Sequence, residues 1–126
     1  MSTDRYLESA AAWRIAQADR NLEVLVAGTP VEPDPARLAL VRRVVADLPG
    51  VARAAANYLD EFVDRGKFAS GNEWWLEGVG STPATGKENE FSLQFSIEGD
   101  TYGMWTVTFR RELERHWPVA FSRHNY

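Results

Sequence analysis

Apolar side chains recur along the chain with two different periods. Up to Gly66 they return every three or four residues, which is the spacing of an α-helix with one buried face. After Gly66 they alternate with polar residues, and Trp, Phe and Thr become frequent, which is typical of β-strands. The pattern therefore predicts an α+β fold in which three N-terminal helices pack on one face of a three- or four-stranded antiparallel β-meander.

The first helix is expected between Thr3 and Gly28. Thr3 or Asp4 can cap its amino end, and Pro30 follows its carboxyl end. Its inward stripe consists of Leu7, Ala11, Ile15, Ala18, Leu22 and Leu25.

Asp34 and Pro35 mark the start of a second helix, because aspartate caps a helix and proline is tolerated at the first helical position. Pro49 and Gly50 either separate this helix from a third one or kink a single long helix. The third helix is expected to end at Gly66. The buried stripes are Leu38, Val41, Val45 and Leu48 in the second helix and Val51, Ala55, Tyr58, Leu59 and Phe62 in the third.

Strands are expected in the second half of the chain. Alternation of apolar and polar residues predicts them at residues 73–79, 90–98 and 103–110, with a weaker candidate at 117–122. We expect one domain over residues 1–126, with a helical part at 4–66 and a sheet part at 73–123.

The second and third strands form a hairpin whose register follows from burial. Directly opposed residues of an antiparallel pair point to the same face, so the apolar rows of both strands are buried together only if Phe95 lies opposite Trp105. The same register places Glu90 opposite Arg110, a favourable pair of opposite charges. Gly103 is a candidate for a β-bulge.

The outward side of this sheet carries very little charge. Solvent-facing strand positions commonly carry Lys or Glu, whereas Trp, Met and uncharged side chains are typical of protein interfaces. If Trp74 and Leu76 of the first strand point inward, Trp75 and Glu77 join the outward face, and Trp75 is the candidate anchor. The predicted partner-binding residues are Trp75, Gln94, Met104, Thr106 and Thr108. If Val119 and Phe121 of the last strand also point inward, Ala120, Ser122 and His124 extend the same face.

Composition limits which kinds of partner the protein can bind and in which compartment we expect it. The chain has 126 residues, of which 44% are hydrophobic and 25% charged, and these values are typical of one globular domain. Its formal net charge of −4 is spread over both halves, so we expect no nucleic-acid partner. Cysteine is absent and no apolar run is long enough for a membrane span, so we expect a cytoplasmic protein with no membrane partner.

Charge is unevenly distributed within the strand half. Residues 73–100 hold six acidic residues and one lysine, whereas residues 110–126 hold four arginines, two acidic residues and both histidines. These groups either pair within the sheet or form a charged rim that steers a partner.

Motifs for metal, cofactor or covalent chemistry are weak. His116 and His124 lack the spacing of a zinc site, and no G-x-S-x-G nucleophile motif is present. The stretch "GSTPATGK" lacks the spacing of a phosphate-binding loop and precedes a strand. We therefore expect no bound metal and no cofactor.

The preferred function is a non-enzymatic protein-interaction module, either a homo-oligomer or a protein of the toxin-neutralising or adaptor type, that uses the uncharged outward face. The alternative is a small-molecule-binding or hydrolytic protein with an aromatic-lined pocket between helices and sheet. The residues proposed for that pocket, with two acids one helical turn apart at its mouth, are Trp13, Tyr58, Asp60, Asp64, Trp74 and Trp105.

Overall fold

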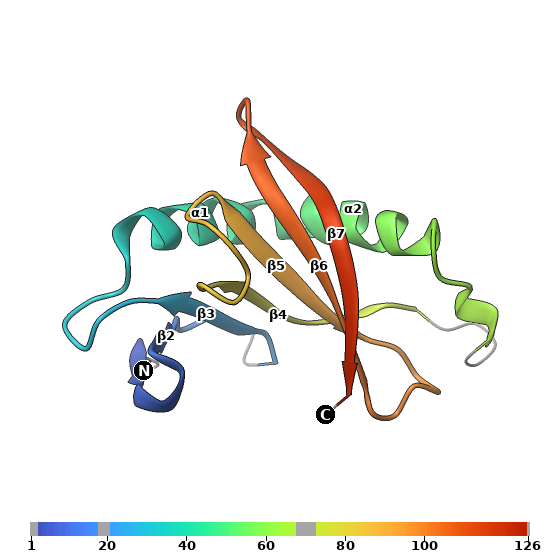
Figure 1. Cartoon of the computed structure of the whole chain (residues 1–126), viewed down its shortest axis with the longest axis horizontal. Helices are drawn as coiled ribbons and strands as arrows, with labels where there is room; N and C mark the ends of the chain where they lie inside the picture. Colours follow the sequence, from blue (N-terminus) through green and yellow to red (C-terminus); the bar gives the residue numbers. More distant parts are fainter. Residues whose placement is uncertain (1–2, 18–20, 68–72, 126) are drawn as a thin grey trace.

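A computed structural model describes residues 3–17, 21–67 and 73–125. In these residues, seven strands form one sheet in the order of the chain, and two α-helices pack on one of its faces (Figure 1). The strands are β1 (Arg5–Leu7), β2 (Ala12–Arg14), β3 (Glu23–Ala27), β4 (Trp75–Ser81), β5 (Glu90–Ser96), β6 (Gly103–Glu112) and β7 (Arg115–Asn125). The helices are α1 (Pro35–Ala46) and α2 (Leu48–Asp60), and the single 3-10 turns are η1 (Glu8–Ala10) and η2 (Arg65–Lys67).

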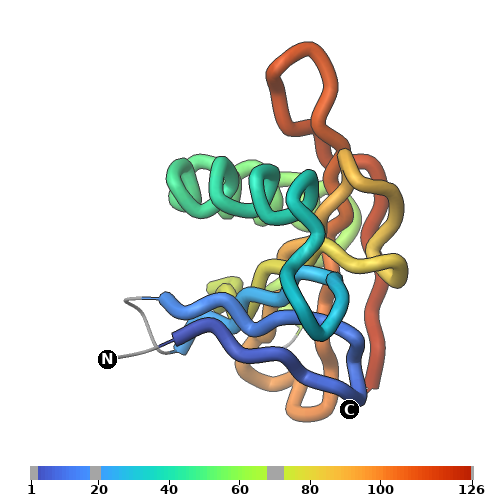
Figure 2. Tube along the Cα trace, turned by 90° about the vertical axis from the view of Figure 1, so that its left-hand side faces the viewer, coloured from blue at the N-terminus to red at the C-terminus, as the bar shows by residue number. Residues whose placement is uncertain are grey.

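One pair of neighbouring strands sets the architecture. β3 and β4 are parallel, whereas every other neighbouring pair is antiparallel. Parallel neighbours cannot be joined by a tight turn, and the connection between them contains both helices. Figure 2 shows both helices on the same side of β5, β6 and β7, with β1 to β3 below them. We call the sheet face under the helices the inner face and the opposite one the outer face.

The predicted arrangement of three amino-terminal helices over a three- or four-stranded meander is wrong. In place of the first predicted helix the described residues form β1, η1, β2 and β3, so the sheet has seven strands and the predicted helical part at 4–66 begins with strands. The four carboxyl-terminal strands do follow one another as antiparallel neighbours.

The first predicted helix fails because its residues pair into the sheet. Val24 and Val26 are fully buried, with Leu25 half-buried between them, which is the alternation of a strand. Helix propensity is a weak preference that strand pairing and burial override. Asp4 caps no helix and accepts instead from the backbone N–H of Ala16, at 2.8 Å. Ala18 of the predicted stripe lies outside the described residues.

The second and third predicted helices exist with shifted limits. The Asp34 carboxylate accepts from the N–H of Ala36 and Pro35 is the first residue of α1, so the predicted start is confirmed. The helices are separate, and they meet at Asp47. α2 ends at Asp60, not at Gly66, and this leaves Phe62 beyond the helix with 58% of its surface exposed.

The face that α1 buries also differs from the predicted stripe. Leu40, Val41 and Val44 are buried, whereas the predicted Leu38 and Val45 are only half-buried. The buried face also includes Arg37, which a purely apolar pattern could not select.

The predicted hairpin register is confirmed. Phe95 lies opposite Trp105 and Glu90 opposite Arg110, whose side chains form an ion pair at 3.5 Å. Gly103 carries no bulge, because the irregular positions lie between Leu76 and Gly78 and between Thr108 and Phe109. A side chain at position 103 would collide with the carboxylate of Asp100, so glycine serves close packing there.

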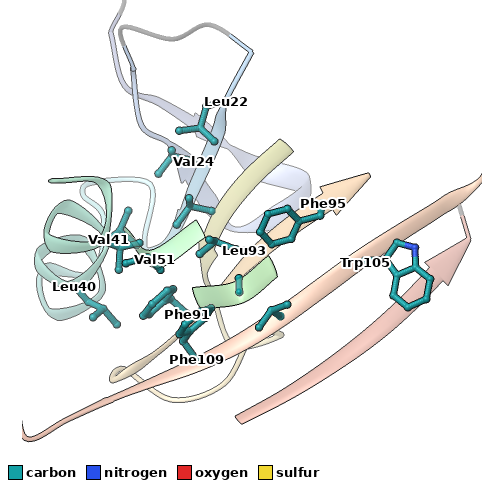
Figure 3. Packing of buried hydrophobic residues seen from close by; sticks show 14 of the residues in the cluster. Leu22, Val24, Leu40, Val41, Val51, Phe91, Leu93, Phe95, Trp105 and Phe109 are labelled. Atoms are coloured by element: carbon teal, nitrogen blue, oxygen red, sulfur yellow. The ribbon is translucent and has the colours of Figure 1, made fainter. Parts of the chain in front are cut away.

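The core lies between the helices and the inner face. Figure 3 shows Phe91, Leu93 and Phe109 clustered with Val41 and Val51 of the helices, and the rings of Phe91 and Phe109 stack with centroids 5.0 Å apart. No helix among the described residues is long and apolar enough to cross a membrane.

Arg37 connects α1 to the loop between β4 and β5. Its guanidinium donates to the carbonyl of Gly86 at 2.9 Å, to the carbonyl of Lys87 at 3.3 Å and to the hydroxyl of Ser81 at 3.3 Å. Asp34 lies 3.5 Å from its Nε and balances its charge. The buried guanidinium therefore supplies a donor to the Gly86 carbonyl and a second donor, beside the N–H of Glu90, to the Lys87 carbonyl.

Replacing Arg37 by Leu is expected to lower the free energy of unfolding by about 2–4 kcal/mol, because the Gly86 carbonyl and the Ser81 hydroxyl lose this donor and Asp34 loses its charged partner. Urea denaturation measures this change. Arg42→Leu, in the same helix and exposed, should change stability by less than about 0.5 kcal/mol. Equal stabilities of the two variants would show that other contacts hold the loop.

Candidate functional site

The surface predicted to bind a partner is the outer face of β4 to β7. Phe95 and Trp105 are buried on the inner face, and the intervening residues of both strands point outward. Both helices pack on the inner face (Figure 2), so no described helix covers the outer one. Its outward side chains, from the turn end of the hairpin upward, are Trp75, Ser96, Met104, His124, Gln94, Thr106, Ser122, Thr108 and Ala120.

Trp75 is the most exposed side chain among the predicted partner-binding residues, with 61% of its surface exposed, whereas its neighbour Trp74 packs against the core. Gln94, Met104, Thr106 and Thr108 are half-buried among their neighbours in the sheet. These rows contain no formally charged residue, but Glu77 bonds to Ser96 beside them, and the ion pair of Glu90 and Arg110 lies on the same face beyond Thr108.

Part of the outer face is covered. Ser92 points outward but is buried, because the loop after β4 folds over it and brings Thr85 close to Gly80. Glu77, at the irregular position of β4, accepts a hydrogen bond from Ser96 at 2.7 Å. The free area of the face therefore lies toward Trp75, Met104 and Ser122.

The sequence analysis missed a second outward tryptophan. Strict alternation places Trp117 on the same side as Phe121, but the register shifts near Val119, and Trp117 pairs with Arg110 on the outer face. Trp117 has 44% of its surface exposed. The available signal was Pro118, because proline within a strand marks an edge or a bulge.

The residues of the alternative pocket do not all lie together. Trp74 and Trp105 meet edge to face at 5.6 Å, and Tyr58 packs on Phe121 at 6.3 Å. Trp13 lies in β2, where its indole N–H donates to the carbonyl of Thr29 at 2.8 Å.

The two acids of that proposed pocket have structural partners. The Asp60 carboxylate accepts from the indole N–H of Trp74 and pairs with Arg65, both at 2.9 Å. Asp64 accepts from the backbone N–H of Gly66 at 3.0 Å. In the described residues, no group of three or more His, Asp or Glu side chains could hold a metal ion.

A cleft that the sequence did not predict lies between the helix junction and the β6–β7 hairpin. Its volume is about 480 Å³, and its lining residues are Arg43, Asp47, Gly50, Val51, Ala54, Phe109, Arg111, Glu114, Arg115 and His116. We call it the arginine cleft. A second cleft of about 340 Å³ beside α1 shares Arg43, Arg111 and Glu114 with it. Neither cleft is lined by a residue of the alternative pocket. The feature of the sequence that pointed to this cleft was the excess of arginine after residue 110.

His116 is neutral in the arginine cleft. The Arg111 guanidinium can only donate, so the Nε2 of His116, at 2.8 Å, accepts this hydrogen bond and the ring proton resides on Nδ1. Burial and the charges of Arg111 and Arg43 lower the pKa of His116, against the opposite effect of Asp47.

Asp100 is the most heavily hydrogen-bonded carboxylate of the hairpin turn. Arg123 donates to both of its oxygens, at 2.5 and 2.9 Å, and the indole N–H of Trp105 donates at 2.8 Å. These bonds, that from Arg123 above all, lower the pKa of Asp100 against the effect of its burial.

The fold and these surfaces define a mixed α/β protein with a two-helix layer on one face of its sheet and an open outer face. Comparison of the chain with models of protein families, with curated proteins and with solved structures finds no match.

Asp100→Asn is expected to lower the melting temperature near pH 7, because the charged partner of Arg123 is lost. The pKa of the Asp100 carboxyl group is lower in the folded state than in the unfolded state, so its ionised form stabilises the fold at a pH above the unfolded-state pKa. This stabilisation disappears as the pH falls through the folded-state pKa. The difference in melting temperature from the wild type should therefore shrink below about pH 3.9. Glu32→Gln is the control for an exposed carboxylate. A difference that does not change with pH would contradict this role.

The turn of the β6–β7 hairpin is strained, because its two loop residues, Leu113 and Glu114, have φ angles of 52° and 61°. Two-residue loops of this kind prefer Asn-Gly. The double variant Leu113→Asn, Glu114→Gly is expected to raise the free energy of unfolding by about 1 kcal/mol, measured by urea denaturation. Leu113→Ala keeps the strain and should stay near the wild type. A double variant no more stable than the wild type would show that the turn is relaxed.

Proposed function

We propose that this chain is a non-enzymatic protein-interaction module that binds its partner through the outer face of the sheet. One observation carries the proposal: a face that no described helix covers presents the exposed Trp75 beside rows of uncharged side chains. The centres of protein interfaces are depleted of charge and enriched in Trp and Met. Trp75 has the character of an anchor residue in such an interface.

The polarity of the outer face favours an unrelated protein over a second copy. Interfaces between identical chains are more apolar than those of complexes between different proteins. Gln94, Thr106 and Ser122 present amide and hydroxyl groups, which can donate and accept hydrogen bonds across a polar interface. Toxin neutralisation and adaptor binding are roles of this kind. We place the protein in the cytoplasm, which a sequence without cysteine supports.

The first experiment tests binding through Trp75. The tagged chain recovers a partner from cells of the organism that encodes it, and the purified partner is then titrated by calorimetry against the wild type and variants. Trp75→Ala should weaken the dissociation constant at least about tenfold, because truncation of an anchor residue costs about 2 kcal/mol or more. Thr106→Lys places a charge in the face and should weaken binding similarly.

Phe62→Ala is the matched control. Phe62 has a similar exposed fraction, 58%, but lies beyond α2 and stacks on Phe121 of the inner face. A partner that binds the Trp75→Ala variant as tightly as the wild type would overturn the proposal. If light scattering shows a dimer that the Trp75→Ala variant does not form, the partner is a second copy of this chain and not an unrelated protein.

A further inference from the structure

The arginines of the carboxyl-terminal hairpin fall into two groups. Arg110 pairs with Glu90, and Arg123 pairs with Asp100. Arg111 and Arg115 form no ion pair with a described residue, and neither does Arg43 of α1. Internal pairing therefore accounts for part of the positive charge after residue 110 and leaves the rest unbalanced.

The three unpaired arginines line the same cleft. Arg43, Arg111 and Arg115 outnumber the two carboxylates there, those of Asp47 and Glu114. His116 is neutral, so its ring adds no charge and offers an N–H. The cleft therefore has an excess of one positive charge in a chain whose net charge is −4.

The floor and the rim of the arginine cleft are apolar in part. Val51, Ala54 and Phe109 contribute to its lining. Leu113, at the turn of the hairpin, lines the adjoining second cleft, which shares Arg43 and Arg111 with this one, and has 88% of its surface exposed. The hairpin projects beyond both helices at the top of Figures 1 and 2, so its turn is accessible to a large partner.

We propose that the arginine cleft binds an acidic segment of a protein partner, with carboxylates held by Arg43, Arg111 and Arg115 and an apolar side chain packed on Leu113. Charge complementarity supports this occupant, because guanidinium groups bind carboxylates through paired hydrogen bonds. The inference rests on the proposed function for the kind of partner, but it concerns a different surface.

An extended nucleic acid fits the cleft less well. A phosphate backbone requires a basic track along several successive phosphates, whereas Asp47 and Glu114 lie among the three arginines. A protein segment can place one or two carboxylates against the arginines and keep uncharged residues beside the two acids.

A peptide with two glutamates and one leucine among glycine and serine residues is the probe, titrated into the full chain and followed by amide chemical shifts. The largest shifts are expected at residues of the arginine cleft. Arg43→Gln and Arg115→Gln should each weaken binding at least about fivefold, because each removes one guanidinium. Both arginines are exposed, and thermal melts should confirm that the variants fold normally.

Arg42→Gln is the matched control, since Arg42 is exposed, adjacent in sequence and does not line the cleft. Binding weakened equally by Arg42→Gln would show diffuse charge attraction, and no binding of the peptide would also overturn the proposal. Inorganic phosphate or a short RNA that binds the cleft more tightly than the peptide would assign it to another ligand. Trp75→Ala should leave peptide binding unchanged, so failure at the outer face and failure at the cleft are distinguishable.

Discussion

Parallel pairing of β3 with β4 is the constraint on which the rest of the structure depends. A parallel pair needs a long connection, and here that connection consists of α1 and α2. Both helices bury their apolar sides against one face of the sheet. Both described α-helices therefore pack on the inner face, and the outer face is formed by the side chains of the strands.

Buried and paired polar groups stabilise the connections around this framework. Arg37 holds the loop after β4, and Asp100 binds Arg123 at the turn of the β5–β6 hairpin. These contacts satisfy charges and carbonyls inside the chain. The arginines of the cleft, which form no ion pair with a described residue, and the exposed Trp75 are therefore the better candidates for contacts with another molecule.

The sequence predicted some strands of the second half better than others, for a physical reason. In β5 and β6, four aromatic residues and their aliphatic neighbours can be buried together in only one register, so the pairing of Phe95 with Trp105 followed from alternation. In β7, a single irregularity near Val119 turned Trp117 to the outer face. The arginine cleft was hidden because Arg43 and His116 are far apart in sequence and meet only when hairpin and helices pack.

The sequence by itself determined the sidedness of the β5–β6 hairpin and the Asp34 cap, because each depends on neighbouring residues or on local burial. It left the outward position of Trp75 conditional on the direction of Trp74, which the structure decided. Only the tertiary structure decided that β1, β2 and β3 replace the first predicted helix, that Arg37 is buried and that three arginines share a cleft. These features depend on partners that are distant along the chain. Alanine favours a helix, but helix propensity differs by less than about 1 kcal/mol per residue, so burial and strand pairing with such a partner override it.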